Sequence, residues 1–190
     1  RQPFHSNDLN LTGVLNGEIY NYRELKSELN EAGYKFQSDC DSEVVVNAYH
    51  YWGKSAFSRF DGMFAIILHD KRDNSFIAAR DPHGIKPLYF INQSSSIQFA
   101  SEIRALEPEH NEIKEVLPGH FFINGGHFEA YKPINRLQEE ETSTTGRLKQ
   151  LISSAVEKRV QTHLPVAVLL SGGVDSSIIL YEAVQHHPKV

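Results

Sequence analysis

The sequence predicts an α+β domain of antiparallel strands, followed by the first strand and helix of a parallel α/β domain. Two helical patterns lie near the start, and three hairpin patterns occupy residues 63–131. An apolar run, a glycine turn and a further helical pattern end the chain. We therefore expect one domain over residues 1–131, a polar linker over 132–146 and the start of a second domain over 147–190.

The first domain opens with a short strand at Leu11–Leu15, which we expect Asn16-Gly17-Glu18 to end. The helix that follows has Asn21 as a candidate N-cap, with Glu24 three residues later. Glycines favour a helix end. The expected bounds are Asn21 and Gly33 for the first helix, and Asp41 and Gly53 for the second.

Strand-forming runs separated by turn residues then indicate hairpins. The expected pairs are residues 63–68 with 76–79, 87–91 with 97–100, and 120–123 with 127–131.

The end of the chain changes character. Residues 148–160 carry a helical apolar stripe, Val166–Leu170 is a continuous apolar run, and Ser176–Gln185 is a second helical pattern. Such a run is typical of a buried parallel strand. Because a parallel partner needs a full crossover, we expect this domain to continue beyond residue 190.

Composition excludes several function classes. The 190 residues are 40% hydrophobic and 23% charged, with a net charge of -5, as in a globular protein. An acidic chain without clusters of Lys and Arg argues against nucleic-acid or anionic-membrane binding. No apolar run approaches the roughly 18–20 residues of a membrane span. The single cysteine, Cys40, suits a cytoplasmic setting, and the histidines show no metal-ligand spacing.

The glycine turn is the sharpest motif. Two glycines, a helix start and serine hydroxyls offer donors to an anion, which indicates a phosphate cradle. The Gly-Lys-Ser/Thr ending of a Walker A loop is absent. The motif reads Leu169-Leu170-Ser171-Gly172-Gly173-Val174-Asp175-Ser176-Ser177.

This turn resembles the pyrophosphate loop of the ATP pyrophosphatases, Ser-Gly-Gly-x-Asp-Ser. The resemblance implies that Asp175 positions Mg²⁺ and that the Leu169 backbone contacts adenine. It also implies a set of residues that hold the pyrophosphate part of ATP: Ser171, Gly172, Gly173, Asp175 and Ser176.

The longer part of the chain resembles the class II glutamine amidotransferases. That resemblance implies an N-terminal-nucleophile-type four-layer αββα sandwich, incomplete here. The matching stretches are residues 15–22, 38–44, 61–65, 79–89 and 99–102.

The same resemblance implies roles for individual residues. Hydrolysis of an amide needs donors for the oxyanion, and the matching residues are Asn16 (side chain) and Gly17 (backbone). Asp41 would bind the α-ammonium of glutamine, with help from Glu18. For Arg80-Asp81 and Gly84 we favour a buried ion pair with a tight turn over a catalytic role.

One departure concerns the nucleophile. In that family it is a cysteine at the mature N-terminus, whereas this sequence starts with Arg1. Cys40 is a poor substitute, because Asp39 and Asp41 disfavour its thiolate. We therefore expect a fragment that has oxyanion donors but lacks its attacking group.

Together the two parts resemble the asparagine synthetase family. The implied substrates are glutamine, aspartate and ATP with Mg²⁺, through β-aspartyl-AMP, and the family suggests a homodimer. Two alternatives remain open. One is a related amidotransferase acting on another carboxylate, such as a β-lactam-forming or glycan-modifying enzyme. The other is a truncated product that serves as a binding or regulatory protein.

Overall fold

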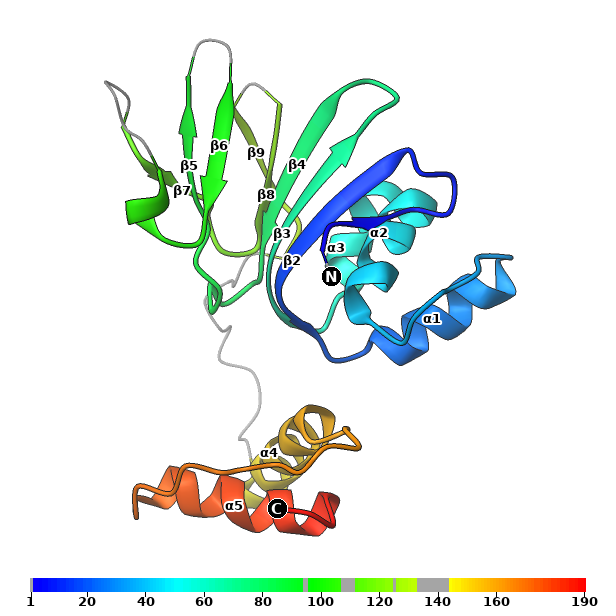
Figure 1. Ribbon diagram of the computed structural model, residues 1–190. Coiled ribbons are helices and arrows are strands. Elements are labelled where there is room, and N and C mark those ends of the chain that lie inside the picture. Colours follow the sequence, from blue (N-terminus) through cyan, green and yellow to red (C-terminus); the bar gives the residue numbers. More distant parts are fainter. Residues whose placement is uncertain (1, 94–95, 107–111, 125, 133–143) are drawn as a thin grey trace. The chain divides into compact units, whose positions relative to one another are not determined.

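The chain forms two compact units, Arg1–Asn135 and Arg136–Val190 (Figure 1). The computed structural model describes residues 2–93, 96–106, 112–124, 126–132 and 144–190. Most of the expected linker, residues 133–143, lies outside this range. No helix in the described ranges is long and apolar enough to span a membrane.

The first unit is built on two antiparallel sheets, and the three expected hairpins are confirmed. The larger sheet has the order β1-β2-β3-β4-β8-β9, and the smaller has the order β6-β5-β7. The strands of the larger sheet are β1 Phe4–His5, β2 Leu11–Ile19, β3 Gly62–Asp70, β4 Ser75–Arg80, β8 His120–Ile123 and β9 His127–Ala130. Those of the smaller sheet are β5 Tyr89–Asn92, β6 Ile97–Ala100 and β7 Lys114–Glu115.

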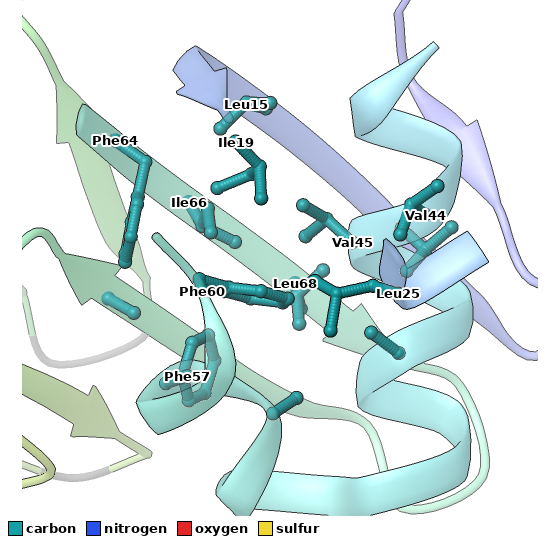
Figure 2. Close-up of a cluster of buried hydrophobic side chains, with 14 of the residues drawn as sticks. Leu15, Ile19, Leu25, Val44, Val45, Phe57, Phe60, Phe64, Ile66 and Leu68 are labelled. Carbon is teal, nitrogen blue, oxygen red and sulfur yellow. The ribbon is translucent and has the colours of Figure 1, made fainter. Parts of the chain in front are cut away.

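Helices cover one face of the larger sheet. They are α1 Tyr22–Glu31, α2 Asp41–Trp52 and α3 Ala56–Arg59, with the short turn η1 Gly53–Ser55 between α2 and α3. A second short turn, η2 Ile103–Ala105, follows β6 of the smaller sheet. Figure 2 shows Leu15 and Ile19 of β2 among side chains from α1, α2 and β3. Because strand side chains alternate between faces, Asn16 belongs to the opposite face of β2.

The smaller sheet packs on that opposite face. Small residues of the larger sheet, Ala65 and Ala78, share a buried cluster with Leu88, Phe90 and Val116. Helices, larger sheet and smaller sheet are three of the four expected layers. The α+β class and the layered antiparallel sheets are therefore confirmed.

Two local expectations at the start of this unit are wrong. Asn16-Gly17-Glu18 does not end the first strand, because β3 pairs with β2 along its whole length, from Leu11 to Ile19. Asn21 does stand at the N-cap of α1, but its side chain makes no cap hydrogen bond. Instead it bridges the carbonyl of Arg59 and the N–H of Asp61.

The second unit pairs two helices, α4 Thr145–Arg159 and α5 Val174–His186. Val156, Val160 and Ala183 form its small core. The expected buried strand at Val166–Leu170 is wrong for this structure: the segment is in no strand, and Leu169 is 94% exposed. A strand needs a neighbouring strand to complete its hydrogen bonds. In the described part of this unit no strand lies beside the segment, and Val166 donates a backbone hydrogen bond to the carbonyl of Lys189 at 2.9 Å.

Candidate functional site

Gly17 occupies a point of β2 where only glycine fits. Its φ is +141°, and a Cβ atom there would lie 2.0 Å from the carbonyl oxygen of Met63. The side chains on either side, Asn16 and Glu18, are exposed. The sequence Asn-Gly-Glu thus places two polar side chains around a strand position that has no side chain of its own.

The backbone of Gly17 is not paired with the residue opposite it. That residue is Phe64. Phe64 accepts from the N–H of Asp81 at 2.8 Å and donates to its carboxylate at 3.2 Å. Because backbone groups in an antiparallel pair alternate between the two edges, the Gly17 N–H faces the edge of β2 away from β3.

Asp41 is brought to the same edge. It is the first residue of α2, and its Oδ2 accepts a hydrogen bond from the N–H of Ile19 at 3.0 Å. The loop before α2 is held by the buried Glu43, whose carboxylate accepts from the backbone of Gln37 and Ser38. Asn16, Gly17, Glu18 and Asp41 are therefore gathered at the end of β2.

A cavity of about 280 Å³ lies beside Asn16, between the two sheets. Asn16 Nδ2 donates to Ser101 Oγ at 2.9 Å across 85 residues of sequence. Gln2 also lines the cavity. Sequence reasoning included Ser101 in a matched stretch without a role and missed Gln2. No periodic signal identifies either contact, because both depend on how distant segments pack.

Gln2 closes part of the edge of β2. Its side-chain amide donates to the carbonyl of Leu15 at 2.7 Å and accepts from the Leu15 N–H at 2.8 Å. The amide therefore replaces the backbone of a neighbouring strand residue. Between Gln2 and Asp41, the outer edge of β2 presents Gly17.

Arg80 and Asp81 support the site rather than form it. Asp81 is fully buried and accepts from the N–H groups of Phe64, His83, Ile85 and Lys86. The expected ion pair between Arg80 and Asp81 is wrong. Planar guanidinium geometry suits several acceptors at once, and Arg80 contacts the following groups: the carboxylate of Glu115 and the carbonyls of Gly84, Lys86 and Val116.

Tyr131 closes the same cluster. Its hydroxyl donates to the carbonyl of Arg80 at 2.6 Å. Burial raises the pKa of Tyr131 far above its usual value, with a smaller effect from the charge of Asp81. Tyr131 is therefore a neutral donor at neutral pH.

Cys40 is the N-cap residue of α2 and is half-buried. Its Sγ lies 3.5 Å from Oδ1 of Asp41. The thiol thus lies beside a carboxylate at the start of α2. The sequence-based argument against a nucleophilic role of Cys40 stays a prediction.

In the second unit, the serine–glycine turn leads directly into α5. Helix α5 begins at Val174, two residues earlier than expected, so that Asp175 and Ser176 lie in its first turn. Gly172 has a φ of +82°, which favours glycine. Gly173 has a φ of -80°, which any residue can adopt, and a Cβ atom there would lie 3.5 Å from Ser171 Oγ.

Two hydroxyls of this turn are hydrogen-bonded to each other. Ser171 Oγ and Ser176 Oγ lie 3.0 Å apart, and the N–H of Gly173 donates to Ser171 Oγ at 3.4 Å. The first N–H groups of a helix have no partner within the helix. The turn therefore collects hydroxyls and free N–H groups at the positive end of a helix dipole.

A cavity of about 690 Å³ adjoins the turn. Leu169 and Asp175 both line it, together with apolar side chains of α4 and α5. The predicted adenine contact and the predicted metal-positioning carboxylate thus border one space. Within the described ranges, no group of three or more His, Cys, Asp and Glu side chains is arranged to hold a metal ion by itself.

Comparison with known families decides the affiliation of the chain. Residues 1–146 match the family described as glutamine amidotransferase domain. The chain belongs to this family. In this glutamine amidotransferase chain, residues 147–190 match a second family, described as asparagine synthase.

Relatives of the amidotransferase chain carry both parts. It is 39% identical to asparagine synthetase [glutamine-hydrolyzing] 2 of Oryza sativa subsp. japonica, over 97% of this chain and 32% of the relative. It is 34% identical to asparagine synthetase [glutamine-hydrolyzing] 1 of Bacillus subtilis (strain 168), over 100% of this chain and 35% of that relative. The chain spans about a third of the length of these relatives.

Solved structures agree on the fold. Glutamine phosphoribosylpyrophosphate amidotransferase from Bacillus subtilis superposes with a TM-score of 0.59 at 22% identity, covering 97% of this chain and 47% of that one. A glutamine aminotransferase class-II domain protein from Silicibacter pomeroyi gives 0.52 at 16% identity, with 71% and 72% covered. The fold is that of the class II glutamine amidotransferases.

Proposed function

We propose that the chain serves ATP-dependent asparagine synthesis with glutamine as the nitrogen source. Residues 1–131 would form the glutaminase domain, 132–146 the linker and 147–190 the start of the synthetase domain. Glutamine is hydrolysed to glutamate and ammonia. ATP activates the side chain of aspartate as β-aspartyl-AMP with release of pyrophosphate, and ammonia displaces AMP to give asparagine.

The hydrogen bond from Ile19 to Asp41 carries the glutaminase part of this proposal. It brings a carboxylate to the Asn16-Gly17 pair, so one edge offers both an ammonium-binding charge and oxyanion donors. Attack on the glutamine amide moves negative charge to the carbonyl oxygen. The Gly17 N–H and Asn16 Nδ2 would stabilise that charge, while Asp41 and Glu18 hold the α-ammonium.

The turn of the second unit would bind ATP. Ser171, Gly172, Gly173 and Ser176 supply hydroxyl and N–H donors for the pyrophosphate part, and the Leu169 backbone would contact adenine. Asp175 adds a negative charge to the same helix start, which would repel phosphates unless a cation lies between them. Mg²⁺ commonly binds one or two carboxylates together with phosphate oxygens, so Asp175 fits it. When bound, Mg²⁺ neutralises charge on the phosphates.

The proposed location, substrates and oligomeric state complete this assignment. We propose that the protein works in the cytoplasm, as its single cysteine suggests. Glutamine, aspartate and ATP are its proposed partners, and the family resemblance favours a homodimer.

The test uses the whole natural protein that carries these residues. Asn16→Ala should lower glutamine-dependent asparagine formation by about 10²–10³-fold, the usual effect of removing an oxyanion donor. Synthesis from added ammonium should survive in this variant. Gly172→Val should abolish both activities, because the side chain blocks the turn. Ser58→Ala, on the exposed side of α3, is the control. Absence of aspartate-dependent pyrophosphate release in the unmodified protein would refute the proposal.

A further inference from the structure

Asn16 is held by a residue from the other sheet. Its Nδ2 donates to Ser101 Oγ at 2.9 Å, and Ser101 directly follows β6. Asn16 lies on β2 of the larger sheet. This bond therefore crosses from one sheet to the other at the rim of the 280 Å³ cavity, which both residues line.

A primary amide has two N–H groups and one oxygen. The bond to Ser101 uses one N–H of Asn16. It also decides which end of the amide faces the cavity, since the hydroxyl oxygen accepts from Nδ2. Without this contact an exposed Asn side chain samples several rotamers, and half of its amide orientations turn the oxygen toward a developing oxyanion.

We propose that Ser101 is the positioning residue for Asn16. It fixes the amide so that the remaining N–H is presented to the cavity. Ser101 itself does not touch the reacting atoms. The inference rests on the proposed glutaminase role of Asn16, but the orientation of the amide can be measured without any activity.

Two neighbours make the arrangement specific. Gln2 binds the backbone of Leu15, the residue directly before Asn16, and so holds this part of β2 in place. Phe99 and Ala100 line the cavity next to Ser101, so β6 reaches the same space. Ser101 thus directly follows the last paired residue of β6, Ala100, which pairs with Tyr89 of β5.

The first experiment measures hydrolysis of glutamine by the whole natural protein. Ser101→Ala should lower kcat about 10-fold and leave KM within about 2-fold, because the lost interaction acts on the transition state. Ser101→Thr, which keeps the hydroxyl, should restore most of kcat. Ser58→Ala is the matched control. Synthesis from added ammonium should not change in any of the three.

A double-mutant cycle separates positioning from a general structural effect. If Ser101 acts through Asn16, then Ser101→Ala should cost nothing further in an Asn16→Ala background. An equal loss of kcat in both backgrounds would show that Ser101 works independently, and the inference would be wrong.

A spectroscopic measurement addresses the contact itself. In a ¹⁵N-labelled sample of the whole natural protein, the side-chain NH₂ signals of Asn16 should shift in Ser101→Ala and stay in place in Ser58→Ala. Unmoved signals would overturn the inference. If the unmodified protein hydrolyses no glutamine, the proposed function fails. If it does so and Ser101→Ala matches it in kcat, only the positioning role fails.

Discussion

The N–H of Ile19 donates to Oδ2 of Asp41 at 3.0 Å and joins the last residue of β2 to the first residue of α2. The two residues are 22 positions apart in the sequence. This bond sets the distance between the carboxylate and the Asn16-Gly17 pair. The negative charge of Asp41 and the ability of its oxygen to accept this hydrogen bond can be separated by mutation.

Asp41→Asn should raise the KM for glutamine at least about 10-fold, because a neutral amide no longer pairs with the α-ammonium. Its oxygen can still accept from Ile19, so the free energy of unfolding should change by less than about 1 kcal/mol. Steady-state kinetics and urea titration measure the two effects. Asp39→Asn, an exposed neighbour with the same charge change, is the control. Equal KM values in both variants would contradict the assignment.

Gly17→Ala should destabilise the first unit by at least about 1–3 kcal/mol, because of its strained φ and the contact with the Met63 carbonyl. Gly33→Ala is the matched control: its φ is also positive, at +92°, but nothing lies within 4 Å of the added atom. Gly33→Ala should therefore lose only the free energy of unfolding that the positive φ costs an alanine. Urea unfolding followed by fluorescence of Trp52, the single tryptophan, measures both. Equal losses would rule out a steric role of the strand pair.

Asp81→Ala should cost about 3 kcal/mol or more, because the buried N–H of Phe64 and the N–H groups of the following loop lose a charged acceptor. Asp73→Ala, which removes an exposed carboxylate with a single backbone contact, should change stability by less than about 1 kcal/mol. The same urea titration compares them. A small effect of Asp81→Ala would mean that water replaces the carboxylate.

Asp8 should make the first unit sensitive to acid. The hydrogen bond from the Ser6 hydroxyl holds the pKa of Asp8 well below its usual range, and contacts with Asn10 and His50 lower it further. In the unfolded chain the pKa of Asp is about 3.9. The ionised form therefore stabilises the fold above about pH 4, and this contribution is lost as the pH falls toward the folded-state pKa.

The corresponding test compares the unmodified chain with Asp8→Asn. The difference in their urea midpoints should be constant from pH 7 to about 5 and shrink at pH 3. Asp73→Asn is the control, because Asp73 is exposed. A difference that stays constant down to pH 3 would exclude the Asp8 carboxylate as its source.

The 190-residue chain on its own should self-associate through the second unit. Leu169 and Leu170 are exposed by 94% and 55%, next to an unpaired backbone. Leu170→Glu should raise the concentration at which light scattering begins. Leu9→Glu removes an isolated exposed leucine of the first unit and should not. A sharp melt of a monomer of the unmodified chain would contradict this expectation.

Hairpins and helix ends could be predicted because they depend on neighbouring residues. The pair β3 and β4, for example, follows from two apolar runs around Asp70–Asn74. The extent of β2 could not. Asn-Gly is a local turn signal, but pairing with β3 outweighed it over residues 16–19.

In the candidate site, too, some features could be predicted from the sequence and others could not. The residues Asn16, Gly17, Glu18 and Asp41 could be named from their chemistry and the resemblance. Their contacts could not: the bond to Ser101 spans 85 residues, and Arg80 reaches Glu115 rather than its neighbour Asp81. Pattern reasoning identifies reactive groups, whereas packing decides which groups meet.

Gln2 has a consequence for association of whole molecules. Sheets join edge to edge when a strand offers unsatisfied N–H and C=O groups to another chain. At Leu15 both groups are already bound by the amide of Gln2. An incoming strand would have to displace that side chain and accept its desolvation. The side chain of Gln2 thus blocks the addition of another strand to β2 at the border of the candidate glutaminase site.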